Sequence, residues 1–172
     1  ILIIPEIPAP HNTNPWKPTE PESPMTINDT SSITLIERVT TDAEYARTIE
    51  GFGEHSLEHG NPIENGERHG FVALDGETFI GSSSGLAYKH ELGYDRWCHL
   101  TDLFVEKSYR HMGIGAQLLA RLEGRFRALG VEYIYTWTAG YEAPGFYKKQ
   151  GYQVFTELED WYVSGHARIG LR

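Results

Sequence analysis

Residues 97–130 have the pattern of a strand, a glycine-containing loop and a helix, and this unit constrains the fold most strongly. Trp97 to Val105 is rich in β-forming residues, and apolar residues then recur at helical spacing from Ile114 to Leu129. Gly130 follows where such a helix would end. A strand that leads into an amphipathic helix through a short loop favours a sheet flanked by helices.

The sequence on either side of this unit predicts further helices and strands. Upstream it predicts a strand over 33–38, a helix from Thr41 or Asp42 to about Glu50, a second, glycine-interrupted helix over 52–59, and a hairpin of 69–74 and 78–80 around Asp75-Gly76. Downstream it predicts a strand over 131–137, a short helix over 143–150, a strand over 152–158 and a last strand over 168–171. The expected fold class is therefore α/β, with a central mixed β-sheet flanked by helices.

The charge balance and the single cysteine exclude several classes of function. The chain has 172 residues, roughly one domain, and a formal net charge of -9, which argues against a surface that neutralises nucleic-acid phosphate. Cys98 is the only cysteine, so no intrachain disulfide and no cysteine-based zinc cluster can form. The apolar runs are shorter than the ~20 residues of a membrane-spanning helix. We expect a cytoplasmic protein without a metal site, a nucleic-acid partner or a membrane segment.

Proline dominates the N-terminal segment. Seven of the nine prolines lie in residues 1–24, a density that forbids helix and disfavours a central strand. The chain does not begin with methionine, and Met25 follows the proline-rich segment directly. We expect an extended arm over 1–24, added to the native protein or upstream of its start, and a single domain over 25–172.

The loop between the predicted strand and helix is a candidate ligand-binding segment. From residue 110 it is Arg-His-Met-Gly-Ile-Gly. Glycines at the mouth of a helix let backbone N–H groups approach a ligand, and the first N–H groups of the helix are unpaired and favour negative charge. A phosphate or pyrophosphate is the expected ligand. A plain turn with glycine for tight packing would have the same pattern, so the loop alone does not show whether a ligand binds there.

Together with a second segment, this loop resembles the acetyl-coenzyme-A motif of the GNAT superfamily of N-acetyltransferases. Arg110, Gly113 and Gly115 match the superfamily pattern Arg/Gln-x-x-Gly-x-Gly/Ala. Residues 143–152, Ala-Pro-Gly-Phe-Tyr-Lys-Lys-Gln-Gly-Tyr, resemble the second coenzyme-binding segment of that superfamily. The resemblance covers roughly 33–172 and implies a GNAT-like acyl-CoA N-acyltransferase fold, with the 25–172 domain as an N-acetyltransferase.

The resemblance also implies how acetyl-CoA is bound, with no metal. The strands ending near Val105 and Trp137 would splay, with pantetheine in the gap, and the loop N–H groups and Arg110 would hold the pyrophosphate. The implied coenzyme-binding residues are Leu103, Phe104, Val105, Arg110, His111, Met112, Gly113, Ile114, Gly115, Phe146 and Lys148.

Two residues are the candidate catalytic groups. Direct acetyl transfer needs a neutral amine, donors at the developing oxyanion and an acid for the departing thiolate. Tyr147 falls where members of the superfamily often use a tyrosine as that acid; a tyrosine packed in the core is the alternative. His99, with an ordinary pKa of about 6.5, suits proton removal through water, and a structural histidine is the alternative. A ping-pong route through Cys98 is not expected, because an isolated cysteine in an apolar strand is more often buried packing.

Several positions near these residues depart from the superfamily or compete with the candidate base. Asp102 matches a common acidic position, but the two-residue period of a strand places it on the opposite face from His99. Thr101 stands where some relatives have a glutamate, His111 where many have a glycine, and Gly140 where many have an asparagine. We therefore expect lower affinity for the coenzyme and an intact fold.

The charge distribution suggests the acceptor. The segment between Val105 and Gln150 carries seven basic and four acidic residues, a net +3, which leaves -12 for the rest of the chain. In the superfamily the acceptor usually meets the first helices and the C-terminal strands, and here these are acidic, over 42–64 and 157–160. We expect direct transfer to a primary amine of a small cationic acceptor such as a polyamine, an aminoglycoside-like compound or a basic peptide. The alternatives are a non-catalytic acyl-CoA-binding sensor of the same fold and a protein N-acetyltransferase; the resemblance also admits a homodimer.

Overall fold

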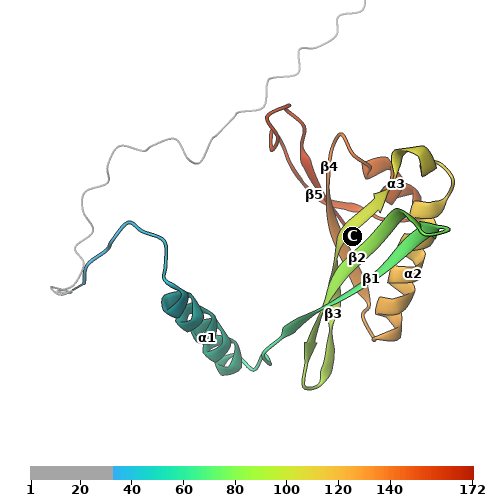
Figure 1. Ribbon diagram of the computed structural model, residues 1–172. Helices are drawn as coiled ribbons and strands as arrows, with labels where there is room; N and C mark the ends of the chain where they lie inside the picture. Colours follow the sequence, from blue (N-terminus) through green and yellow to red (C-terminus); the bar gives the residue numbers. More distant parts are fainter. Residues whose placement is uncertain (1–32) are drawn as a thin grey trace, which may run out of the picture. The chain divides into compact units, whose positions relative to one another are not determined.

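The computed structural model describes residues 33–172, and the predicted arm over 1–24 lies outside them (Figure 1). Of the described residues, 33–41 belong to one unit and Asp42–Arg172 to a second. The helices of the described chain are α1 (Asp42–Glu58), α2 (Ile114–Ala128) and α3 (Pro144–Lys149), with a 3-10 turn at Lys107–Tyr109. The strands are β1 (Asn65–Asp75), β2 (Thr78–His90), β3 (Gly93–Val105), β4 (Tyr133–Ala139), β5 (Val154–Leu158) and β6 (Arg168–Leu171).

The strands of the described chain form one six-stranded mixed sheet in the order β1-β2-β3-β4-β6-β5. β1, β2 and β3 are antiparallel neighbours, β3 and β4 are parallel, and β6 lies between β4 and β5, antiparallel to both. α2 connects β3 to the parallel β4 and packs across β1, β2 and β3 (Figure 1). The predicted mixed α/β sheet flanked by helices is confirmed.

The core lies between the sheet and α2. The apolar residues that recur at helical spacing turn one face of α2 inward, where Leu118, Leu119, Leu122 and Phe126 are buried. Burial of one such side chain is worth roughly 1.5–3 kcal/mol, so this face holds the helix on the sheet. The strands, α3 and the segment between α3 and β5 complete the core with Ala87, Cys98, Leu100, Tyr147, Tyr152, Ile169 and Leu171.

The β1–β2 hairpin forms as predicted, but its turn is displaced by one residue. Asp75 pairs with Thr78, so the two-residue turn is Gly76-Glu77 rather than Asp75-Gly76. Gly76 has a φ of 60°, a conformation that glycine adopts without steric cost. Both strands also run farther from the turn than the sequence predicted.

α1 is one continuous helix, so the predicted interruption by glycine is wrong. Glycine inside a helix costs only about 1 kcal/mol, and polar contacts along the helix offset this. Arg47 lies 3.3 Å from a Glu50 carboxylate oxygen and 3.0 Å from a Glu54 carboxylate oxygen.

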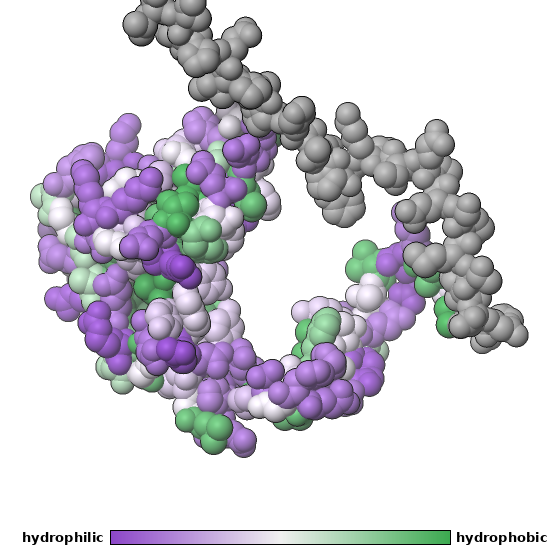
Figure 2. Space-filling model, turned by 180° about the vertical axis from the view of Figure 1, so that it is seen from behind, coloured by the Kyte–Doolittle hydropathy of each residue, from purple (hydrophilic) through white to green (hydrophobic). Residues whose placement is uncertain are grey.

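No helix in the described part of the chain is long and apolar enough to cross a membrane. Phe52 of α1 is exposed, and hydrophobic patches (green) interrupt the hydrophilic surface in Figure 2.

The predicted strand over 33–38 is wrong. These residues have no strand conformation, and Ile33, Leu35 and Ile36 are exposed. A strand needs a neighbouring strand to satisfy its backbone groups, and local β propensity cannot supply one.

Candidate active site

The parallel strands β3 and β4 separate at one defined point. Their register begins at Trp97 and Tyr133 and ends at Leu100 and Thr136. Beyond it, β3 continues to Val105 with only β2 as its partner, and β4 continues with only β6. Alternate backbone groups of this part of β3, which includes Leu103, Phe104 and Val105, therefore have no strand partner on the β4 side.

The loop after β3 presents backbone N–H groups at the start of α2. Gly113 is the N-cap with a φ of 81°, and no side chain caps the helix. The first intrahelical bond runs from the Gln117 N–H to the Gly113 carbonyl, 3.1 Å, so Ile114, Gly115 and the next residue keep unpaired N–H groups. Such a helix start favours an anion, and these residues fit a phosphate-bearing coenzyme.

Arg110 and His111 shape the entrance to this loop. The Arg110 Nε–H donates to the Val105 carbonyl, 3.0 Å, which ties the loop to the end of β3. His111 has a φ of 65°, in the left-handed region that favours glycine. This backbone conformation gives a physical reason for the glycine that many GNAT members have at this position. Met112, the next residue, is exposed.

The two coenzyme-binding segments that the sequence predicted meet in space. A Cβ built on Gly115 would lie 3.6 Å from the Phe146 ring of α3 and 3.6 Å from Val105 of β3. These are ordinary van der Waals distances, so the first turn of α2 lies against both α3 and the end of β3. Lys148 is exposed on α3, with no contact to the loop among the interactions of the described residues.

Tyr147 lies at the point where β3 and β4 separate. Thr136 lies beside its hydroxyl, and the Thr136 hydroxyl donates to the Leu100 carbonyl, 3.0 Å. Leu100 and Thr136 are the last paired residues of the two strands. Tyr147 is only 6% exposed, and burial raises the pKa of its phenol, while Thr136 has the opposing effect. The hydroxyl therefore keeps its proton at neutral pH.

His99 and Asp102 lie on the same face of the sheet, so the prediction that they occupy opposite faces is wrong. Asp102 pairs with Ser84 and His99 pairs with Leu86, two positions apart on one face of β2. The register shifts between Ser84 and Gly85, because Thr101 is an extra residue on β3. Such a β-bulge reverses the alternation of side chains.

A polar network surrounds the Asp102 carboxylate. Ser84 Oγ donates to it at 2.7 Å and Thr101 Oγ1 at 2.7 Å. Arg68 lies 3.4 Å from the same oxygen and donates to the Thr101 hydroxyl at 2.9 Å. Hydrogen bonds from Ser84 and Thr101, with the positive charge of Arg68, lower the pKa of Asp102. This face therefore carries an ionised carboxylate.

His99 is held as a neutral, half-buried imidazole. Its ring stacks on Tyr135 of β4, with centroids 4.6 Å apart and planes 3° apart. Burial lowers the pKa of His99, and the positive charges of Arg168 and Arg68 lower it further, while Asp102 opposes them. At neutral pH the ring can accept a proton.

The sequence analysis missed Arg168, which lies near this face. Its guanidinium carbon is 5.1 Å from the Trp137 ring centroid and 5.0 Å from that of Trp161. Such cation–π contacts hold the guanidinium in place. Ser84, Arg68 and Tyr135 were missed as well. Only the register of neighbouring strands, which no local pattern encodes, brings these side chains near His99.

Cys98 lies next to His99 on the other face of β3. It is fully buried, and burial together with the negative charge of Glu123 raises the pKa of its thiol to about 12. A thiol with that pKa is protonated at neutral pH and is a weak nucleophile. This agrees with the expectation that Cys98 serves packing.

Comparisons with known proteins find acetyltransferases that are similar to this chain. A blasticidin-S acetyltransferase of Streptomyces morookaense is 34% identical over 70 residues, 38% of this chain and 49% of that protein. The chain thus spans about half the length of this curated relative. A crystal structure of an acetyltransferase from Bacillus cereus is 27% identical, with a TM-score of 0.65 over 80% of this chain and 95% of that one.

A second structure, from Bacillus anthracis, is described as a streptothricin acetyltransferase in complex with acetyl coenzyme A. It is 21% identical, with a TM-score of 0.51 over 64% of each chain, and supports the fold alone. Residues 33–152, which include the Gly113 loop and all of α3, match the acetyltransferase (GNAT) family. The chain therefore belongs to the acetyltransferase (GNAT) family.

Proposed function

We propose that this protein is an acetyl-coenzyme-A-dependent N-acetyltransferase that moves the acetyl group directly to a primary amine of a small molecule. The proposal rests on one observation. The last β3–β4 pair and the Tyr147 hydroxyl lie where the C-terminal part of β3 begins, and the uncapped start of α2 follows where that strand ends. Acetyl-CoA supplies an activated thioester carbonyl and a phosphate-bearing handle. The chain supplies backbone N–H groups for each.

His99 is the proposed base. An amine in water is mostly protonated and must lose a proton before it can attack a carbonyl. The neutral His99 ring accepts that proton, directly or through water. Asp102, three positions along β3 on the same face, favours the imidazolium that forms, because its effect is to raise the pKa of His99.

Tyr147 is the proposed acid. When the new N–C bond has formed and the C–S bond breaks, the departing sulfur carries negative charge and needs a proton. The phenol has a raised pKa, so it is protonated at neutral pH; it donates its proton to the sulfur as the C–S bond breaks and regains a proton from water. Thr136 orients the hydroxyl, because its own hydroxyl is fixed by donation to the Leu100 carbonyl.

Direct transfer is favoured over a covalent acyl-enzyme. With its pKa raised to about 12, the Cys98 thiol offers almost no thiolate at neutral pH. Its side chain is also buried in the core, on the opposite side of β3 from the proposed base. A ping-pong route through this residue is therefore disfavoured.

The proposed acceptor is a small cationic amine. The ionised Asp102 lies beside the proposed base, and the exposed aromatic rings of Trp97 and Phe104 can attract a cation through their faces. Exposed acidic residues on α1 and over 157–160 add negative charge to the chain. The names of the relatives agree with a small-molecule acceptor.

A thiol-release assay with acetyl-CoA across a panel of amines tests the proposal. We expect release with a polyamine or an aminoglycoside and little release with neutral or acidic amines of equal size. Preferential turnover of acidic acceptors would overturn the acceptor class alone. Calorimetry that shows acetyl-CoA binding without release on any amine would favour the non-catalytic module, and turnover only on protein N-termini or lysines would favour a protein acetyltransferase.

A further inference from the structure

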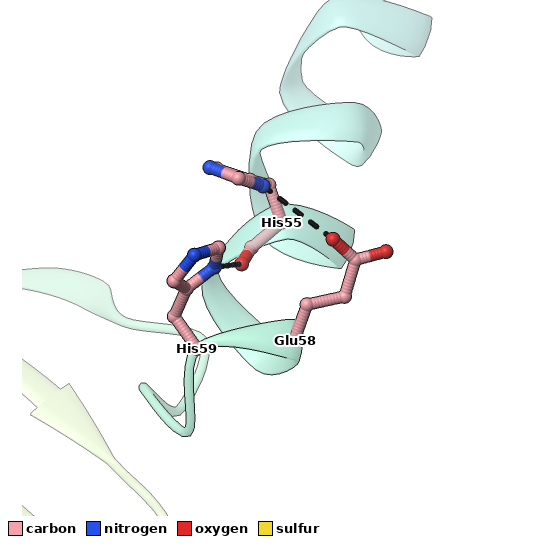
Figure 3. A group of neighbouring side chains, drawn as sticks. All are labelled: His55, Glu58 and His59. Carbon is pink, nitrogen blue, oxygen red and sulfur yellow. Dashed lines mark hydrogen bonds and ion pairs between the residues drawn. The ribbon is translucent and has the colours of Figure 1, made fainter.

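The end of α1 carries three potential metal ligands on one side of the helix. His55, Glu58 and His59 follow one another at spacings of three and one, so their side chains share the last turn (Figure 3). Each offers a ligand atom, and these atoms all lie within 4.8 Å of one another. Among the described residues, no other group of three histidine, cysteine, aspartate or glutamate side chains has this property.

We propose that His55, Glu58 and His59 bind a divalent transition metal of the zinc, nickel and copper group. Two imidazole nitrogens and one carboxylate oxygen are a donor set that these ions prefer to the all-oxygen sets of magnesium and calcium. All three residues are exposed, so water fills the remaining coordination positions. The ion joins the helix end to the turn that follows it.

The hydrogen bonds within the group prepare one ring for a metal. The Nδ1 atom of His59 lies 2.9 Å from the His55 carbonyl oxygen. A carbonyl can only accept, so this contact requires a proton on Nδ1 and leaves Nε2 with a free lone pair. Metal-binding histidines are commonly oriented in this way, by donation from the other ring nitrogen to a carbonyl or carboxylate.

The carboxylate is placed beside the second ring. A Glu58 carboxylate oxygen lies 3.4 Å from Nδ1 of His55, and the two imidazole centroids are 4.3 Å apart (Figure 3). A ligand–ligand separation near 3.4 Å is close to that of a tetrahedral ion with bonds of about 2.0–2.1 Å. The His55–Glu58 pair thus already has the spacing of two ligands of one ion, and a ligand atom of His59 lies within 4.8 Å of both.

The local electrostatics favour a dication. Residues 42–64 contain six acidic side chains and one basic side chain, Arg47. Arg47 lies against Glu50 and Glu54, so it does not neutralise Glu58. The partial negative charge at the C-terminus of a helix adds to the attraction, and the group sits at that end of α1.

Calorimetric titration of the tag-free, full-length protein with zinc chloride, after removal of metal by a chelator, tests the site. We expect one zinc ion per chain, and we expect His55→Gln and His59→Gln each to weaken binding by at least about tenfold, the lower end of what even an outer partner of a metal site contributes. Glu58→Gln should weaken it less. His166→Gln, which removes another exposed histidine, is the matched control and should bind zinc as the parent does.

A second readout separates loss of the site from loss of the fold. The replaced side chains are exposed, so each metal-free variant should keep the thermal midpoint of the parent. Zinc should raise the midpoint of the parent and of His166→Gln only. Absence of binding to the parent, or equal binding by the parent and a His55→Gln/His59→Gln double variant, would overturn the proposal. Neither readout requires acetyl transfer, so the result is independent of the proposed function.

Discussion

The two sides of the candidate active site are built differently. On the proposed coenzyme side, the loop from Arg110 to Gly115 is a continuous segment whose candidate coenzyme-binding groups are backbone N–H groups. On the face that carries His99, side chains come from separate strands, such as Ser84 on β2, Asp102 on β3 and Tyr135 on β4. The first side needs only a local backbone conformation. The second needs a correct register across the sheet.

This difference explains how substitutions should act. Backbone donors are insensitive to the identity of their side chains, so the coenzyme side should respond chiefly to changes that alter φ and ψ. The His99 face should respond to single charges and hydroxyl groups, because each supplies one specific interaction.

Tyr147→Phe gives the largest expected effect. Removal of a general acid costs typically 10²–10⁴-fold, so kcat should fall at least about a hundredfold in steady-state assays. The matched control is Tyr152→Phe, another buried tyrosine of the same cluster, whose hydroxyl donates to Glu123 at 2.9 Å. It should change kcat only a few-fold. Equal losses in both variants would assign Tyr147 to packing.

His99→Gln tests the proposed base on the other face of the sheet. Loss of a general base should lower kcat/KM about a hundredfold, while the affinity for acetyl-CoA stays near that of the parent. Calorimetry for binding and thiol release for turnover separate the two quantities. The Tyr135 stacking partner is unaltered, and a stable fold is checked by thermal denaturation. Undiminished turnover would remove His99 from the mechanism.

Gly113→Ala tests the backbone of the coenzyme side. A side chain in the left-handed region costs about 1–2 kcal/mol, which the free loop of the variant avoids by relaxing; binding must then restore the left-handed conformation, so the affinity for acetyl-CoA should fall about tenfold by calorimetry. Gly115→Ala is the control, because its Cβ meets only ordinary contacts of 3.6 Å and its φ is not positive. If Gly115→Ala were the more damaging change, steric contact rather than backbone conformation would govern this loop.

Arg168→Gln tests the charge near His99. Burial and positive charge lower the pKa of His99, so the acidic limb of kcat/KM should lie below pH ~6.5 in the parent. Loss of the Arg168 charge removes one lowering effect, which should move the limb to higher pH. Arg168→Lys keeps the charge and should leave the limb in place. Asp102→Asn removes a raising effect and should move it to lower pH. If all four proteins had the same pH profile, the acidic limb would not report the titration of His99.

His111→Gly has the smallest expected effect. Glycine adopts a φ of 65° without the cost that a side chain brings, so the unfolding free energy should rise by up to about 1 kcal/mol. Met112→Gly, where φ is not positive, should not stabilise the protein. Chemical denaturation of the three proteins measures both changes. A destabilised His111→Gly variant would show that the histidine side chain makes an essential contact.

Local patterns in the sequence predicted most of the fold. The helical period from Ile114 to Leu129 and the terminal strand over 168–171 correspond closely to α2 and β6, because side-chain periodicity and end signals are encoded within each segment. The strand over 33–38 was wrong, because strand pairing involves residues outside the local window. The break in α1 was wrong, because glycine in a helix costs little and contacts such as that between Arg47 and Glu54 offset this cost.

The sequence by itself determined the mixed sheet, the glycine loop at the start of α2 and the α3 segment with Tyr147. The side-chain periods, glycines and end signals that predicted these elements lie within short stretches of the chain. Only the tertiary structure decided which side chains share the face with His99. The bulge at Thr101 brings Asp102 to that face, and pairing of distant strands adds Arg68, Ser84 and Tyr135. An extra residue in a strand inverts the alternation beyond it, and only the partner strand shows where that residue lies.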